Sequence, residues 1–212
     1  MKNLFPVSIA LGLRQLKELE INSCGLEEIV ANEEVKVAAV FKFLQLDFSQ
    51  LVDLPELKSF YPRSHTTELP LLKSLVVYHC HRLLSQSENQ TQHPLFSPGE
   101  VISDLKLEKL SIDSDDIKLI CSGFSHFSGK MFHKLEDLQV VCFHCESPVF
   151  PLDFLRRFHK LRTLVVARSN FIVLFPSQES DQQKHHVKVK SLPITILKLD
   201  SLPHLQHIWK RS

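Results

Sequence analysis

Apolar residues return along this chain at one characteristic spacing. Two residues separate each of the first three apolar positions, one separates the third from the fourth, and two precede a final cysteine or apolar residue. Segments 13–24, 69–80, 132–143 and 158–166 carry this spacing closely. The central apolar-x-apolar pair places two side chains on one face of a short strand, so each segment predicts one strand of a repeated unit.

Three weaker copies begin at residues 43, 104 and 191, so that successive copies start 26 to 35 residues apart. The copy at 43 has Ser49 where an apolar residue is expected. A one-residue shift to Leu44, Leu46 and Phe48 would also give a strand, which leaves the register of 41–57 open. A period in this range is typical of stacked repeats, in which each unit buries its apolar face against its neighbours.

The spacing is that of a leucine-rich repeat. We therefore expect an α/β fold: a right-handed solenoid, curved as part of a horseshoe, with a parallel β-sheet on its concave face and irregular loops or short helical turns on its convex face. Residues 1–212 should form a single array of about seven irregular repeats, with exposed polar insertions at 85–99 and 177–190. Neither end shows a polar capping repeat, so the array is expected to be truncated at both ends.

Composition is that of an ordinary globular protein. The 212 residues are 43% hydrophobic and 23% charged, and the net charge of +1 gives no field that would favour nucleic acid or an anionic membrane. No apolar run approaches the roughly 18–20 residues of a membrane span. The first residues lack the apolar core of a secretory signal, and the five cysteines are an odd number. We therefore expect reduced thiols and a cytoplasmic location.

Residues that could support catalysis or bind metal are sparse. Cys142 and Cys145 form a Cys-x-x-Cys pair, but no second pair follows at the spacing of a structural zinc site. Cys24 and Cys80 occupy the repeat position where a cysteine bonds backbone groups and fills the core. We expect no enzyme activity, no cofactor, no metal and no small-molecule substrate. A metal-binding domain built on cysteine and histidine is the less favoured alternative.

Four sequence segments resemble a known protein family in more than the spacing of their leucines. Segments 19–30, 54–62, 69–77 and 202–209 resemble the leucine-rich-repeat region of plant coiled-coil nucleotide-binding leucine-rich-repeat disease-resistance proteins. The resemblance implies a protein-recognition module of an intracellular immune receptor. Such a module binds a pathogen effector or a guarded host protein, or holds a nucleotide-binding domain inactive. A truncated remnant without independent function is the alternative. The phosphate loop of the nucleotide switch is absent from this sequence.

The expected partner surface follows from the alternation of side chains along each strand. Residues between and after the two core positions point outward, and in the middle of the array several are apolar. An apolar patch beside arginines suits a protein partner, although Val and Tyr also simply favour strands. The residues predicted to contact the partner are Val76, Tyr78, Val141, Arg162, Val165 and Arg168.

Overall fold

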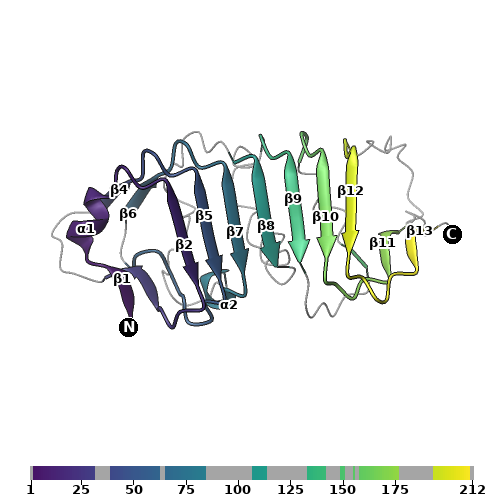
Figure 1. The fold of residues 1–212 in the computed structure, drawn as a ribbon, viewed down its shortest axis with the longest axis horizontal. Helices are drawn as coiled ribbons and strands as arrows, with labels where there is room; N and C mark the ends of the chain where they lie inside the picture. Colours follow the sequence, from purple (N-terminus) through teal and green to yellow (C-terminus); the bar gives the residue numbers. More distant parts are fainter. Residues whose placement is uncertain are drawn as a thin grey trace, which may run out of the picture.

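The computed structural model describes residues 2–31, 39–62, 65–84, 107–113, 133–141, 149–150, 155, 158–176 and 193–210. Both expected insertions, 85–99 and 177–190, lie outside these residues. Seven short strands form one parallel sheet whose order follows the chain (Figure 1). They are β2 (Glu18–Asn22), β5 (Phe48–Val52), β7 (Ser74–Tyr78), β8 (Lys109–Asp113), β9 (Asp137–Val141), β10 (Thr163–Ala167) and β12 (Ile196–Asp200).

The register is continuous across this sheet. Leu19 pairs with Ser49, Ser49 with Leu75, and the same row continues through Leu110, Leu138, Leu164 and Leu197. Ser49 therefore occupies the core position and is 6% exposed, whereas Leu44 of the shifted alternative is exposed. The first of the two registers considered for this copy is confirmed.

Shorter strands precede, separate and follow those of the main sheet along the chain. They form three two-stranded parallel sheets: β1 (Asn3–Phe5) with β3 (Glu28–Val30), β4 (Ala39–Lys42) with β6 (His65–Glu68), and β11 (Val173–Pro176) with β13 (His207–Lys210). Two short helices, α1 (Val7–Gly12) and α2 (His81–Leu84), accompany them. The connections were expected to be loops or helical turns, so these strands are a correction. They have only three or four residues, too few for alternation to reveal them in the sequence.

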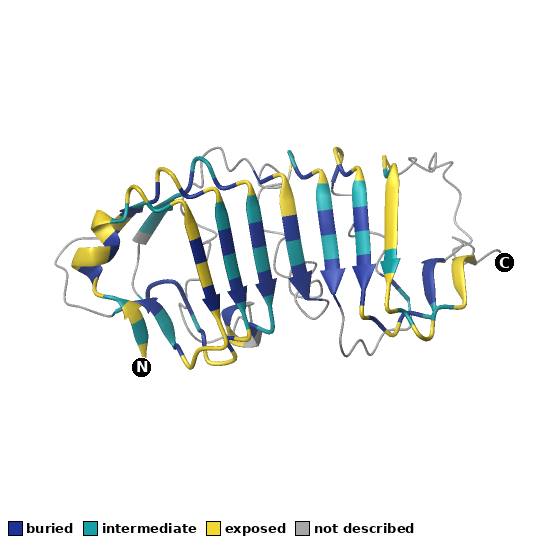
Figure 2. Ribbon diagram, in the orientation of Figure 1, coloured by how far each residue is buried: buried dark blue, intermediate teal, exposed yellow. Residues whose placement is uncertain are grey.

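The core lies beneath the main sheet and is best formed in its middle. Leu138 of β9 is completely buried, whereas Leu197, its counterpart in β12, is 37% exposed. Figure 2 shows this difference as a change from alternating blue bands to the yellow of β12. β12 is the last strand of the described sheet, whereas β2 at the other end keeps its inward Leu19 and Ile21 buried.

Five strands of the main sheet end in the same turn. The residue after the strand has a positive φ of 49° to 53° in five repeats: Ser23, Asp53, His79, Arg168 and Ser201. The N–H groups of Ser23 and Asp53 still donate to carbonyl oxygens of the next strand, at 2.9 and 3.0 Å. This left-handed residue turns the chain away from the sheet while extending the hydrogen-bond ladder by one rung.

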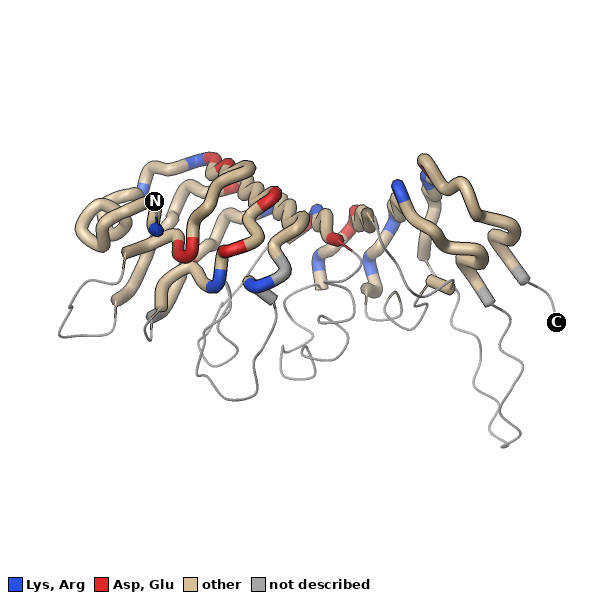
Figure 3. Tube along the Cα trace, turned by 90° about the horizontal axis from the view of Figure 1, so that it is seen from below, with Lys and Arg blue, Asp and Glu red and all other residues tan. Residues whose placement is uncertain are grey.

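The outward face of the sheet is concave. The side of the molecule that faces the viewer in Figure 1 points upward in Figure 3. In that view the strands in the middle of the sheet lie lower than those at its two ends. The parallel strands and few helices fit the expected α/β class. Neither described helix has the length and apolar character needed to cross a membrane.

Candidate functional site

Three rows of outward residues line the concave face, because alternate residues of each strand point away from the core. One row begins with Glu18, and the other two, named here the first and second rows, begin with Glu20 and Asn22. The register aligns them across all seven strands. The first row is Glu20, Gln50, Val76, Ser111, Gln139, Val165 and Lys198. The second row is Asn22, Val52, Tyr78, Asp113, Val141, Ala167 and Asp200.

Five of the six predicted contact residues have exposed surface on or beside these rows. Val76, Tyr78 and Val165 are partly exposed, and the two arginines that bracket β10, Arg162 and Arg168, are exposed. Val141 is different, because it is only 6% exposed. The expectation of an exposed Val141 is therefore corrected.

The burial of Val141 has a local reason. It lies in register between Asp113 of β8 and Ala167 of β10, and both of these neighbours are buried as well. A short side chain flanked on both sides on a concave surface retains little accessible area. Val141 therefore belongs to the floor of the face, and the larger Tyr78 offers more area to a partner.

Tyr78 is held in a polar setting despite its partial burial. Burial raises the pKa of the phenol above its usual value, which a hydrogen bond with Ser111 partly offsets. The carboxylate of Asp113 raises this pKa further, and the guanidinium of Arg168 lowers it. Tyr78 and Arg168 thus interact electrostatically across the face, although β8 and β9 separate their strands. The structure brings these two predicted contact residues into one electrostatic environment.

A histidine links two carboxylates at the end of the same strands. His79 Nδ1 lies 2.6 Å from Asp53 Oδ1, and His79 Nε2 lies 3.6 Å from Asp113 Oδ2. Asp53 and His79 occupy the same left-handed position in adjacent repeats, which is why their side chains meet. The sequence analysis did not predict this contact. Aligning the residue after each strand would have suggested it.

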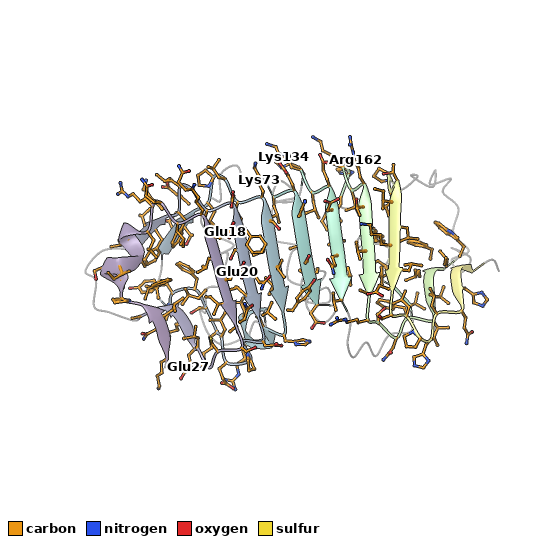
Figure 4. All side chains as sticks on the ribbon, in the orientation of Figure 1. Glu18, Glu20, Glu27, Lys73, Lys134 and Arg162 are labelled. Carbon is orange, nitrogen blue, oxygen red and sulfur yellow. The ribbon has the colours of Figure 1, made fainter. Side chains whose placement is uncertain are left out.

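Charged residues also mark the other end of the strands, just before each begins. Their carbonyl oxygens accept two N–H groups from the next repeat; Lys17, for example, accepts from Asp47 and Phe48. The side chains are exposed, and Figure 4 shows two of them, Lys73 and Arg162, at the upper edge of the sheet. The position reads Lys17, Asp47, Lys73, Glu108, Glu136 and Arg162. The sequence analysis singled out only Arg162 of this set.

Comparison with known proteins gives one match. The family model described as plant disease resistance protein RPS2-like, leucine-rich repeats, matches residues 106–212. The chain belongs to this family. No curated protein and no solved structure matches it. The predicted resemblance is thereby confirmed, and the family indicates a defence-related module for protein interaction rather than a catalyst.

The matched segment of this leucine-rich-repeat protein includes β8, β9, β10 and β12. The earlier strands β2, β5 and β7 continue the same sheet in the same register. The repeat geometry therefore extends over both halves of the chain. Tyr78 of β7 and Arg168, which follows β10, therefore belong to the same repeat array.

Of the two cysteines that the structure describes in this leucine-rich-repeat protein, Cys80 fills the core as expected, and the same expectation for Cys24 is corrected. Cys80 is buried, and its thiol donates to the carbonyl oxygens of Leu51 and Tyr78, whereas Cys24 is exposed. Cys142 and Cys145 lie outside the described residues. Within the described residues, no group of three or more His, Cys, Asp or Glu side chains is placed to hold a metal ion.

Proposed function

We propose that this protein is a right-handed leucine-rich-repeat solenoid that recognises another protein through its concave face. The observation that carries the proposal is the partly exposed apolar set Val76, Tyr78 and Val165, beside Arg162 and Arg168. Tyr and Arg are the residues that most often dominate the binding energy of protein interfaces. An apolar floor next to them excludes water and strengthens the polar contacts around it.

The proposed setting is an intracellular plant immune receptor in the cytoplasm. There the concave face would bind a pathogen effector or a guarded host protein, or would hold the receptor's nucleotide-binding domain inactive. Membership of the disease-resistance family supports this setting. The proposed partner is a protein, and not a nucleic acid, a membrane or a small molecule.

The test replaces Tyr78 and Arg168 together by alanine. A partner is first captured from plant extract with the wild-type chain, then purified, and its affinity for both forms is measured by calorimetry. The double variant should bind more weakly by more than about 2 kcal/mol, or about thirtyfold, because both side chains lie at the proposed centre. Its unfolding temperature is measured alongside: Arg168 is exposed and its loss should matter little, whereas Tyr78 is partly buried and its loss should lower stability modestly without unfolding the protein.

The matched control changes His185 and His186, which lie outside the described residues, to alanine. This variant should keep wild-type affinity. If the histidine variant loses the partner while the Tyr78/Arg168 variant retains it, the proposed recognition face is wrong.

A further inference from the structure

The first outward row of the concave face has opposite charges at its two ends. It begins with Glu20 on β2 and ends with Lys198 on β12, and both side chains are exposed. The five residues between them carry no charge and include two valines. They are Gln50, Val76, Ser111, Gln139 and Val165.

Neighbouring residues reinforce each end of this row. Glu18 lies beside Glu20 on β2, and Arg162 and Arg168 bracket β10, next to β12. Figure 4 shows the two glutamates on β2 and Arg162 at the opposite part of the sheet. Each end also has one charge of the other sign: Lys17 beside the glutamates and Asp200 beside Lys198. Asp200 accepts a hydrogen bond from the hydroxyl of Ser201 at 3.1 Å.

Charges between the two ends are buried, offset by a neighbour or outside this row. Asp113 is buried, and Lys109 and Asp137, whose side chains are 63% and 40% exposed, offset each other in an ion pair of 4.0 Å. Lys73, Glu108 and Glu136, also near the middle, occupy the same position just before their strands as Arg162, at the edge of the sheet and outside this row. The row itself therefore presents an acidic end, an uncharged and partly apolar middle, and a basic end.

The separation of these ends sets a length for the partner. Six steps between neighbouring strands separate β2 from β12, and at about 4.8 Å per step the ends lie about 29 Å apart. An extended peptide rises about 3.3 Å per residue, so about nine residues span this distance. The Debye length at physiological salt is about 8 Å, so each end attracts its own partner charge independently.

We propose, resting on the proposed function above, that the partner lays an extended segment with separated charges across the strands. Basic residues of this segment lie over Glu18 and Glu20, and acidic residues lie over Lys198. Apolar residues between them contact Val76 and Val165. Charge complementarity of this kind fixes the orientation of the partner and speeds association more than it adds affinity.

The test selects binders for the full chain from a displayed library of random peptides of about 16 residues, long enough to span the face when extended. Peptides enriched on the wild type should carry a basic and an acidic block about nine residues apart, with apolar residues between them. On the Glu18→Lys/Glu20→Lys variant, the enriched peptides should lose the basic block. Wild-type-selected peptides should bind this variant about tenfold more weakly at low salt, and this difference should shrink as salt rises.

The matched control is Glu27→Lys/Glu28→Lys, which changes the net charge equally but lies away from β2, below it in Figure 4. Peptides selected on this variant should keep both blocks. Enriched peptides without separated charges, no enrichment at all, or a basic block that survives reversal of Glu18 and Glu20 would each overturn the inference. If the selected peptides bind the Tyr78→Ala/Arg168→Ala variant with the same affinity as the wild type, the proposed function would instead be refuted.

Discussion

The thiol of Cys80 lies 3.5 Å from the carbonyl oxygen of Leu51, one repeat earlier in the sheet. This contact joins neighbouring repeats, and Cys80 is completely buried. The equivalent Cys24 donates only within its own repeat, to the carbonyl oxygen of Asn22 at 3.1 Å. Within the described sheet no strand precedes β2, so Cys24 has no earlier strand to cover it and is exposed.

The two equivalent cysteines should therefore react differently with an alkylating reagent. Cys24 should be modified rapidly in the native protein, whereas Cys80 should be modified only as the protein unfolds, because a buried thiol is inaccessible to the reagent. Brief treatment with iodoacetamide followed by peptide mass spectrometry measures both sites in one sample. A denatured sample provides the control for intrinsic reactivity. Equal labelling of Cys24 and Cys80 in the native protein would contradict the burial described here.

Leu138 should contribute more to stability than any exposed residue of its repeat. It is completely buried between Leu110 and Leu164, as the repeat spacing predicts. Leu138→Ala should lower the free energy of unfolding by about 2–5 kcal/mol, through lost burial and the cavity left behind. Leu197 lies in the same row but is 37% exposed, so Leu197→Ala should lower the free energy of unfolding by less.

Chemical denaturation of both variants measures this difference, with Gln139→Ala as an outward-facing control. Leu138→Asp would bury a charge without a partner and should unfold this part of the protein. Protection of Leu138→Asp from proteolysis equal to that of the wild type would show that the assigned register is wrong.

The main sheet could be predicted because its strands share one strong signal. The inward leucines repeat at one spacing, and Leu110, Leu138 and Leu164 align as expected. The short strands β4 and β6 could not be predicted in this way. β6 contains two threonines and a glutamate, so its pattern carries no apolar alternation, and pairing with β4 defines it as a strand.

The candidate site was predictable only in part for a related reason. Alternation assigns a side chain to the outward face, but it does not say how much its neighbours cover it. Val141 was placed on the outward face by its spacing, and its exposure was then reduced by Asp113 and Ala167 from adjacent strands. The contact between His79 and Asp53 likewise joins two repeats and depends on their three-dimensional stacking.

Ser49 should be a site where stability can be increased. It lies in the core row between Leu19 and Leu75 and borders a cavity of about 30 Å³. Ser49→Val replaces the hydroxyl with methyl groups that can fill part of this space, and valine favours a strand. We expect a gain of about 1 kcal/mol in the free energy of unfolding, typical of cavity filling.

Chemical denaturation tests the effect of Ser49→Val, with Ser49→Ala as a control that removes the hydroxyl without filling the cavity. The valine variant should be more stable than the alanine variant. A valine variant less stable than alanine would mean that the cavity does not accommodate the added methyl group.

The left-handed residue after β2 should restrict which substitutions it tolerates. Ser23 has a φ of 51°, and its N–H group donates to the carbonyl oxygen of Val52 at 2.9 Å. A β-branched side chain is strained in this conformation, so Ser23→Val should destabilise the protein by about 1–2 kcal/mol. Ser23→Asn should be nearly neutral, because asparagine tolerates this region. Thermal unfolding of the two variants measures the contrast, and equal stability would argue against a left-handed residue at this position.

Tyr78 should ionise only above the ordinary tyrosine pKa of 10.0, chiefly because burial disfavours the phenolate. A group whose pKa is raised in the folded state stabilises the fold fully below its unfolded pKa. This contribution is lost as pH rises through the folded pKa. Ultraviolet absorbance of the phenolate, compared between the wild type and Tyr78→Phe, isolates the titration of Tyr78. The wild type should also lose more stability than Tyr78→Phe as the pH is raised above about 10.

The same titration tests the electrostatic link between the two central residues of the proposed recognition face. Arg168 lowers the pKa of Tyr78, so Arg168→Ala should raise that pKa further. Lys58→Ala removes a positive charge that pairs with Glu27 beside β3, away from Tyr78, and should leave the Tyr78 titration unchanged. The two variants carry the same net charge, so a difference between them reflects the position of Arg168 and not the total charge. An unchanged Tyr78 titration in Arg168→Ala would show that the two side chains act independently, and their effects on partner binding should then be additive.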